Sequence, residues 1–201
     1  MRISREHPLL LASASPRRRE LLELARIPFE VVRAPVDESP SPGEQALAYA
    51  PRVARAKLAA ANAALPSEMR ARAAIVLAAD TTVILDGRIF GKPESDDDAR
   101  TMLRALAGRV HEVMTAFALG DPRTSRLVAE VAVRTSVEMR SLDAAEIDGY
   151  VSTGEPSDKA GAYAIQGMAS SLVRRIEGSH TNVIGLPTAE LVTELRRLEL
   201  L

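Results

Sequence analysis

Short apolar runs alternate along the chain with longer stretches in which apolar residues recur every three to four positions. The runs are typical of buried strands, and the longer spacing is typical of amphipathic helices. The runs predict strands over 9–12, 29–33, 75–79, 83–85, 88–90, 111–119, 127–139 and 172–176. The helical spacing predicts helices over 16–25, 44–64, 96–107, 144–152 and 188–198. This alternation of helices and strands favours an α/β fold.

Two turn signals predict antiparallel strand pairs within that fold. Asp86-Gly87, between two short apolar runs, is a strong hairpin signal, and Asp121-Pro122 separates the two longest predicted strands. Because hairpins require antiparallel neighbours, we expect a mixed, twisted sheet. The sequence contains no repeat, no low-complexity tract and no long linker, so we expect residues 1–201 to form a single domain.

The composition of the chain excludes several kinds of binding partner. The 201 residues carry 26 Lys plus Arg against 27 Asp plus Glu, a net charge of -1, so the broad attraction used by non-specific nucleic-acid or acidic-membrane binders is lacking. No apolar run approaches the ~20 residues of a membrane span. We therefore expect neither a nucleic-acid polymer nor a membrane as partner. The chain has no Cys, which excludes disulfides and thiolate metal sites and favours a cytoplasmic protein.

Three consecutive arginines follow a Ser-Ala-Ser-Pro segment at the predicted start of the first helix. Ser15 suits the N-cap, where the partial positive charge of the helix disfavours cations by about 0.3 to 1 kcal/mol each. A phosphate bound there would reverse the sign of that cost. Successive helical residues lie about 100° apart, so we expect Arg17 and Arg18, with Ser13, to contact it. The alternative is a solvated basic turn paired with the glutamates that follow.

Asp80 is the candidate carboxylate, because it ends the predicted strand 75–79. Open α/β sheets place their ligands at the carboxyl ends of strands. Burial raises the pKa of a carboxyl group and a nearby cation lowers it, so we expect Asp80 to serve as a base or as a metal ligand. The alternative is an aspartate that begins a turn.

Three further polar residues lie among small or rigid neighbours. Lys92 follows the predicted hairpin in Gly-Lys-Pro, where it contacts a phosphate or, as is commoner for a single exposed lysine, is only solvated; the glycine spacing excludes a P-loop. Lys57 lies among small residues of a predicted helix, where a lysine with a solvated head group is the simpler interpretation. Gln166 can donate and accept hydrogen bonds at once, as reading a base edge requires, or it satisfies loop backbone.

The order of these segments carries more information than any one of them. They are Ser13-Ala14-Ser15-Pro16-Arg17-Arg18, Asp37-Glu38, Arg52 through Lys57, Ala79-Asp80-Thr81, Gly91-Lys92-Pro93, Gly108-Arg109-Val110-His111 and Ala164-Ile165-Gln166-Gly167. In this order they closely resemble the Maf family of nucleoside triphosphate pyrophosphatases. The resemblance implies an α/β domain like that of inosine-triphosphate pyrophosphatase, with a nucleotide cleft between two lobes, and often a homodimer.

The resemblance also implies an activity and roles for residues. Family members hydrolyse nucleoside triphosphates to the monophosphate and pyrophosphate with a divalent cation, here Mg²⁺, or Mn²⁺ or Co²⁺. The aspartate matching Asp80 is taken as the proton acceptor. Specificity positions fall on Arg17, Thr81 and Gln166, a combination similar to the branch that prefers dTTP and UTP. The branch acting on 7-methylguanosine triphosphate has an aromatic residue in place of Arg17, and His180 stands where relatives commonly carry Tyr.

A mechanism follows as a hypothesis. The cations expected to bind the triphosphate are Arg17, Arg18, Lys57 and Lys92. Glu38 and Asp80 would hold metal or water, and water would attack the α-phosphorus. Thr81 and Gln166 would read the carbonyl and N–H edge of a pyrimidine. A nucleotide-binding regulator without turnover is the alternative, since this family is also associated with arrest of septum formation; RNA binding is disfavoured by the balanced charge.

Overall fold

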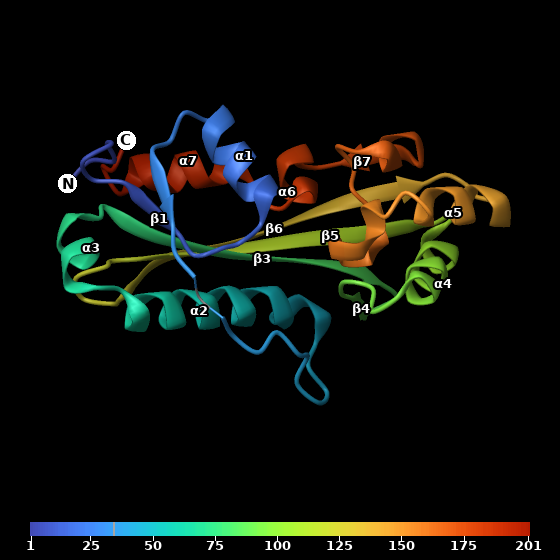
Figure 1. Cartoon of the computed structure of the whole chain (residues 1–201), viewed down its shortest axis with the longest axis horizontal. Coiled ribbons are helices and arrows are strands. Elements are labelled where there is room, and N and C mark those ends of the chain that lie inside the picture. Colours follow the sequence, from blue (N-terminus) through green and yellow to red (C-terminus); the bar gives the residue numbers. More distant parts are fainter. Residues whose placement is uncertain (34) are drawn as a thin grey trace. The chain divides into compact units, whose positions relative to one another are not determined.

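The computed structural model describes residues 1–33 and 35–201 (Figure 1). Within these residues a seven-stranded sheet has the order β2-β1-β3-β5-β6-β7, with β4 paired to β3. The strands are β1 Leu9–Leu11, β2 Phe29–Val31, β3 Ile75–Leu85, β4 Arg88–Phe90, β5 Val110–Gly120, β6 Leu127–Met139 and β7 Val173–Glu177. β1 runs parallel to β2 and β3, whereas β4 and β7 run antiparallel to β3 and β6. The predicted mixed sheet is therefore confirmed.

The helices agree with the predicted ranges to within two residues at each end. They are α1 Pro16–Leu24, α2 Ala46–Ala64, α4 Asp96–Leu106, α5 Ala144–Val151 and α7 Thr188–Arg197. Elements that the spacing did not predict are α3 Ser67–Arg72, α6 His180–Ile184 and the 3₁₀ turns η1 Glu155–Asp158, η2 Ala160–Ala162 and η3 Met168–Ser171. Each of these is six residues or shorter, too short to show a helical repeat of apolar positions.

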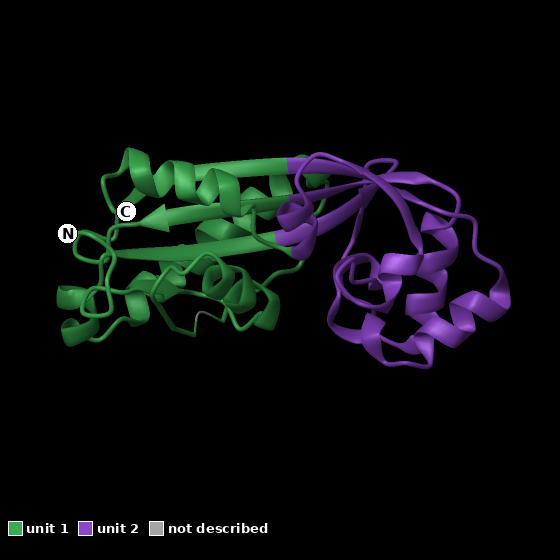
Figure 2. Ribbon diagram, turned by 90° about the horizontal axis from the view of Figure 1, so that it is seen from above, with its two compact units in different colours: residues 1–80, 115–133, 185–201 green, residues 81–114, 134–184 purple. Residues whose placement is uncertain are grey.

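The chain divides into two compact units (Figure 2). The first unit comprises Met1–Asp80, Thr115–Val133 and Gly185–Leu201, and the second comprises Thr81–Met114 and Arg134–Ile184. The strands β3, β5 and β6 each contribute residues to both units. That residues 1–201 form one domain stays a prediction.

In the first unit, helices cover both faces of the sheet. α1 and α7 lie on one face and α2 lies on the other (Figure 1). The strand β1 is entirely buried, as its apolar run predicted. α2 can approach the sheet closely because its buried face is rich in alanine and because Gly120 in β5 has no side chain; a Cβ there would lie 2.8 Å from a methyl carbon of Leu58.

The second unit has its own apolar core, to which β3, β5, β6, α4 and α5 all contribute. The predicted hairpin is present: Asp86 and Gly87 connect β3 to β4 with positive φ angles of 51° and 74°. Two positive φ values suit the two-residue turns that match strand twist. The two helices are capped by their own side chains, α4 by Ser95 and α5 by a capping box between Asp143 and Glu146.

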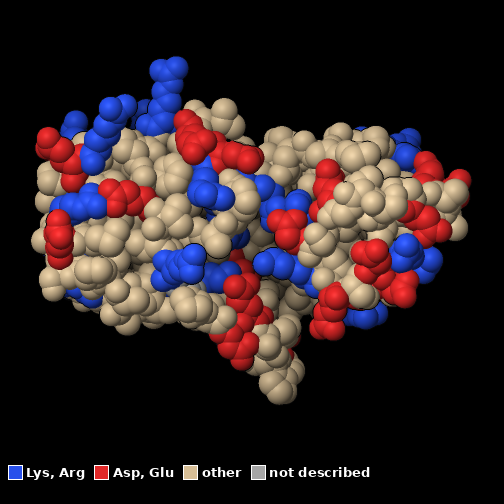
Figure 3. All heavy atoms as spheres, in the orientation of Figure 1, with Lys and Arg blue, Asp and Glu red and all other residues tan. Residues whose placement is uncertain are grey.

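Charged side chains of both signs are interspersed over the visible face of each unit (Figure 3). This distribution agrees with the net charge of -1. No helix in the described part of the chain combines the length and the apolar character that a bilayer crossing requires.

His111 is a buried histidine in the second unit. Its Nε2 lies 2.8 Å from the Tyr163 hydroxyl, and the two rings meet edge to face. Its Nδ1 is buried and finds no hydrogen-bond partner within the described residues. Burial lowers the pKa of His111 from 6.5 to about 4, because desolvation disfavours the imidazolium.

We expect this histidine to make the protein sensitive to acid. The unfolded chain takes up the proton near pH 6.5 and the folded chain only near pH 4, so stability present above pH 6.5 is lost as the pH falls, by about 3 kcal/mol in total. His111→Gln, which can still bond the Tyr163 hydroxyl, should weaken this dependence. The measurement is urea unfolding between pH 7.5 and pH 4.5. The exposed His180 provides the control, and equal slopes in His111→Gln and His180→Gln would contradict the assignment.

Candidate functional site

Asp80 lies in the middle of a strand. The prediction that the strand ends at Asp80 is wrong, because β3 continues through Leu85 into the hairpin with β4. The residues after Asp80 are mostly β-branched, which favours this continuation. β1 pairs with β3 only as far as Leu77, so Asp80 follows the point where its parallel neighbour has ended. Asp80 is therefore neither at a strand terminus nor in a turn.

Lys57 joins two carboxylates in the first unit. Its Nζ lies 2.8 Å from Oδ1 of Asp80 and 3.0 Å from Oε1 of Glu38. Lys57 and Asp80 are buried, whereas the Glu38 side chain is 46% exposed. The interpretation of Lys57 as a lysine with a solvated head group is therefore wrong. The alanines around it on α2 let the helix pack closely enough to bury the ammonium against β3.

Arg18 is the buried arginine of the basic segment. Its Nε donates to the carbonyl of Gly185 at 2.8 Å and its Nη1 donates to the Ser13 hydroxyl at 2.9 Å. Arg17 is partly exposed and Arg19 is exposed. The start of α1 at Pro16 with Ser15 in the N-cap position is confirmed. The Ser15 side chain makes no capping bond within the described residues; the Ser13 hydroxyl instead accepts from the Ser15 N–H.

The backbone around Glu38 is held by α2. The Tyr49 hydroxyl donates to the Glu38 carbonyl at 2.6 Å, and Arg52 donates to the Ser39 carbonyl at 3.0 Å. Arg52 also forms a two-point ion pair with Glu44. These contacts set the place of the Glu38 carboxylate relative to Lys57 on the same helix. The sequence did not identify Tyr49, which precedes Lys57 by eight residues, a little over two turns of the helix.

The charges of this group influence one another strongly. Burial raises the pKa of Asp80 above its ordinary value, and the nearby Lys57 and Arg18 oppose that rise only in part. Burial likewise lowers the pKa of Arg18, against the attraction of Asp80 and Glu38. We refer to Arg18, Glu38, Lys57 and Asp80 as the charged cluster. A carboxyl group with a raised pKa beside buried cations is a common property of catalytic sites.

The charged cluster fits a divalent cation in one respect. Oδ2 of Asp80 is buried and accepts no hydrogen bond from any described residue, and the Glu38 carboxylate is close by through the shared Lys57. No group of three or more His, Cys, Asp or Glu suited to a metal occurs among residues 1–33 and 35–201. Mg²⁺ usually binds through one or two carboxylates together with phosphate oxygens and water, so two carboxylates suffice when a triphosphate supplies the rest.

The other predicted residues belong to the second unit. Thr81 is the next residue of β3 after Asp80, Lys92 is exposed in the loop after β4, and Gln166 is exposed between η2 and η3. The segments that carry the last two are joined, because the Gly161 N–H donates to the Gly91 carbonyl at 3.0 Å. The structure thus brings Ser13, Arg18, Glu38, Lys57 and Asp80 together in one unit and links the Lys92 and Gln166 segments in the other.

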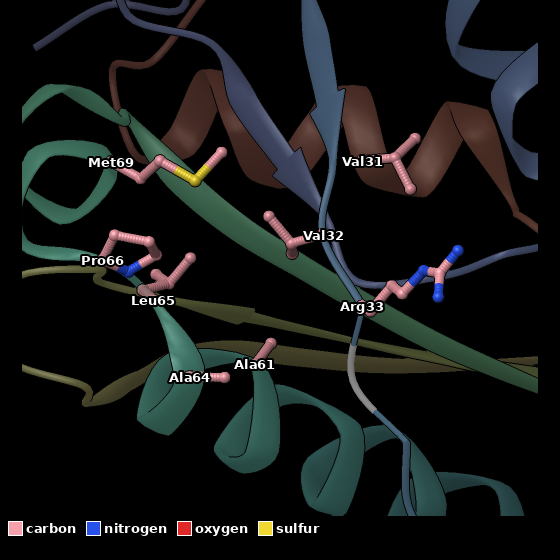
Figure 4. Close-up of a pocket in the computed structure, with 8 residues that line it drawn as sticks. All are labelled: Val31, Val32, Arg33, Ala61, Ala64, Leu65, Pro66 and Met69. Carbon is pink, nitrogen blue, oxygen red and sulfur yellow. The ribbon is translucent and has the colours of Figure 1, made fainter.

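A cavity of about 250 Å³ lies in the first unit and has no residue of the charged cluster in its lining (Figure 4). It lies between residues 31–33 on one side and the end of α2 with the start of α3 on the other. Its lining is Val31, Val32, Arg33, Ala61, Ala64, Leu65, Pro66 and Met69. None of the predicted site residues contributes to it, and seven of its eight lining residues are apolar, so the predicted chemistry has no charged pair or carboxylate there.

Comparison with known proteins gives consistent matches over nearly the whole chain. A family model described as Maf-like protein matches residues 8–198. A protein named dTTP/UTP pyrophosphatase from Geobacter sp. (strain M21) is 51% identical over 188 residues, which are 94% of each chain. One of the same name from Chromobacterium violaceum is 50% identical over 187 residues, 90% of each chain. The Staphylococcus aureus Ham1 protein superposes with a TM-score of 0.51 at 15% identity, covering 96% of this chain and 99% of that one, which confirms the predicted fold class.

Proposed function

The chain belongs to the Maf family, and from this we propose that it is a nucleoside triphosphate pyrophosphatase that converts dTTP and UTP to the monophosphate and pyrophosphate. The names of its relatives support this substrate class. The observation that carries the proposal is the buried Lys57 held between Asp80 and Glu38 beside Arg18. Burying an ion pair usually costs more free energy than it returns, which favours a functional role for the cluster.

The cations of the first unit bind the triphosphate in this proposal. Arg18 is oriented by Ser13 and by the Gly185 carbonyl, and Arg17 is the partly exposed arginine beside it. A planar guanidinium suits two-point binding of phosphate oxygens, and an ammonium such as Lys57 adds a compact charge. Lys92 of the second unit is proposed as a further phosphate contact.

Asp80 takes the proton of the attacking water. As the water oxygen bonds to the α-phosphorus, the bond from that phosphorus to the bridging oxygen breaks and pyrophosphate leaves. An ordinary aspartate is a weak base at neutral pH, so the raised pKa of Asp80 improves proton transfer. Lys57 orients the Asp80 carboxylate through Oδ1, which leaves Oδ2 for the water or a cation.

Glu38 and Asp80 are the residues that would hold a divalent cation. Such a cation, Mg²⁺ or alternatively Mn²⁺ or Co²⁺, neutralises phosphate charge and lowers the pKa of bound water when it is present. Thr81 and Gln166 are proposed to contact the base, because a site that hydrogen-bonds the edge of uracil or thymine rejects bases without that pattern. A homodimer and a cytoplasmic location stay predictions.

The direct test is pyrophosphate release from a panel of triphosphates. We expect release from dTTP and UTP with Mg²⁺ at more than ten times the rate seen with dCTP, dGTP or 7-methylguanosine triphosphate, because hydrogen bonding to the base discriminates strongly. EDTA should abolish release and added Mg²⁺ or Mn²⁺ should restore it. Nucleotide binding without pyrophosphate release would instead support a regulator, and preference for 7-methylguanosine triphosphate would support the other branch of the family.

A further inference from the structure

Gln166 is presented by a tight turn in the second unit. The Gly167 N–H donates to the Ala164 carbonyl at 2.9 Å and closes the turn around Ile165 and Gln166. Ile165 is buried, whereas Gln166 is exposed. Just before the turn, the buried Tyr163 is fixed by its contact with His111. The Gln166 amide therefore projects from a short segment whose preceding residues are anchored in the core.

Glu155 anchors the other side of the same turn. Its Oε2 accepts the Met168 N–H at 2.9 Å, and its Oε1 accepts the Ala169 N–H at 3.2 Å and the Tyr150 hydroxyl at 2.8 Å. The pKa of Glu155 is lowered, because these three donors and the nearby Lys159 favour the charged form by more than burial opposes it. One carboxylate thus holds two successive backbone N–H groups located two and three residues after Gln166.

Gly167 is the residue that lets this carboxylate approach. A Cβ at position 167 would lie 2.3 Å from Oε2 of Glu155 and 2.6 Å from its carboxyl carbon. Heavy atoms without a bond between them do not approach so closely, so any side chain at this position would displace the carboxylate or the turn. The contacts of the Glu155 carboxylate with the Met168 and Ala169 N–H groups therefore require a glycine at position 167.

We propose that Glu155 is a positioning residue for base recognition, which holds the Ala164–Gly167 turn so that the Gln166 amide meets the pyrimidine edge. The inference rests on the proposed function, because it takes Gln166 as the group that reads the base. Glu155 touches no substrate in this account. Discrimination between bases depends on the amide being held in place before the nucleotide binds, since a mobile amide would lose free energy on ordering and would adapt to the wrong base.

The test compares kcat/KM for dTTP and dCTP in five proteins: the natural chain, Glu155→Gln, Gly167→Ala, Gln166→Ala and the double variant Glu155→Gln/Gln166→Ala. Gln166→Ala should lower the dTTP preference by about ten- to a hundredfold. Glu155→Gln and Gly167→Ala should each lower it by about tenfold. In the double variant the loss should equal that of Gln166→Ala alone, because Glu155 acts only through that amide.

Matched variants separate positioning from general damage to the fold. Glu177→Gln changes an exposed glutamate of the same unit and should leave the preference unchanged. Tyr150→Phe removes one of the three donors to Glu155 and is the substitute variant if Glu155→Gln does not fold. It should lower the dTTP preference by less than the tenfold expected for Glu155→Gln. Amide exchange at Met168 and Ala169 should quicken in Glu155→Gln, independently of any activity.

The outcomes distinguish this inference from the function it rests on. No pyrophosphate release by the natural chain would overturn both. The positioning role would be overturned if Gln166→Ala left the base preference unchanged. It would also be overturned if Gln166→Ala lowered the preference while Glu155→Gln and Gly167→Ala each left it within twofold of the natural value. Glu155→Gln could also lower the dTTP preference as much in the Gln166→Ala variant as in the natural chain. That result would show that Glu155 does not act through Gln166.

Discussion

Replacing Asp80 by Asn is expected to lower kcat for dTTP hydrolysis by about a thousandfold. A positioned general base contributes roughly 10² to 10⁴ in rate, and the amide can neither take the proton nor hold a divalent cation as a carboxylate does. Asn has nearly the same shape, so its oxygen can still accept from Lys57, whose Nζ lies 2.8 Å from Oδ1 in the natural chain. Pyrophosphate release under saturating dTTP and Mg²⁺ measures the change.

The control for this variant is Asp86→Asn. Asp86 is an exposed residue of the hairpin turn that pairs with Arg109, and its positive φ suits Asn. Asp86→Asn should change neither the kcat nor the KM for dTTP by more than about twofold. If Asp80→Asn retained more than a tenth of the natural kcat while binding dTTP normally, Asp80 would not be the proton acceptor.

Replacing Lys57 by Met is expected to lower kcat/KM by about a hundredfold and to move the acid limb of the pH profile to higher pH. The methionine keeps a similar length but removes the charge, and loss of one group that stabilises developing charge costs about 10² to 10³. Lys57 is the largest influence that opposes the burial of Asp80. Without it, the pKa of Asp80 rises further, so the base is protonated at a higher pH.

Arg55→Met on the same helix is the matched comparison. Arg55 is exposed and pairs with Glu130, and surface ion pairs contribute about 1 kcal/mol or less. We expect its pH profile to coincide with that of the natural chain. A profile for Lys57→Met that falls in amplitude without moving along the pH axis would mean that Lys57 binds phosphate but does not control Asp80.

The fold was predictable where local pattern and burial agree. The buried run of β1, the Asp86-Gly87 hairpin and the alanine-rich spacing of α2 all identified their elements, because each depends on neighbouring residues alone. The end of the strand at Asp80 was predicted wrongly, since a polar residue inside an apolar run resembles a terminus. The tertiary structure shows that Lys57 and Arg18 lie near its carboxylate, which allows a charged residue inside a buried strand.

The types of the site residues allowed them to be predicted, but the contacts between these residues could not be predicted from the sequence. Arg18, Lys57 and Asp80 could each be singled out, but no spacing indicates that the Lys57 ammonium lies between two carboxylates 19 residues before and 23 residues after it. The Gly185 carbonyl that receives Arg18 is a backbone group 167 residues away and has no side-chain signal at all. Glu155 was missed for the same reason, because its partners are backbone N–H groups.

Tyr49, Arg52 and Lys57 lie on one helix, so their spacing along α2 fixes where the Lys57 ammonium lies relative to the backbone at residues 38 and 39. Each residue added or removed between positions 49 and 57 would turn Lys57 by about 100° and shift it 1.5 Å along the axis relative to Tyr49. The Lys57 ammonium would then no longer reach the carboxylate of Glu38, whose backbone carbonyl is held by Tyr49. Changes of chain length are therefore tolerable in the exposed 40–43 loop and excluded from these two turns of helix.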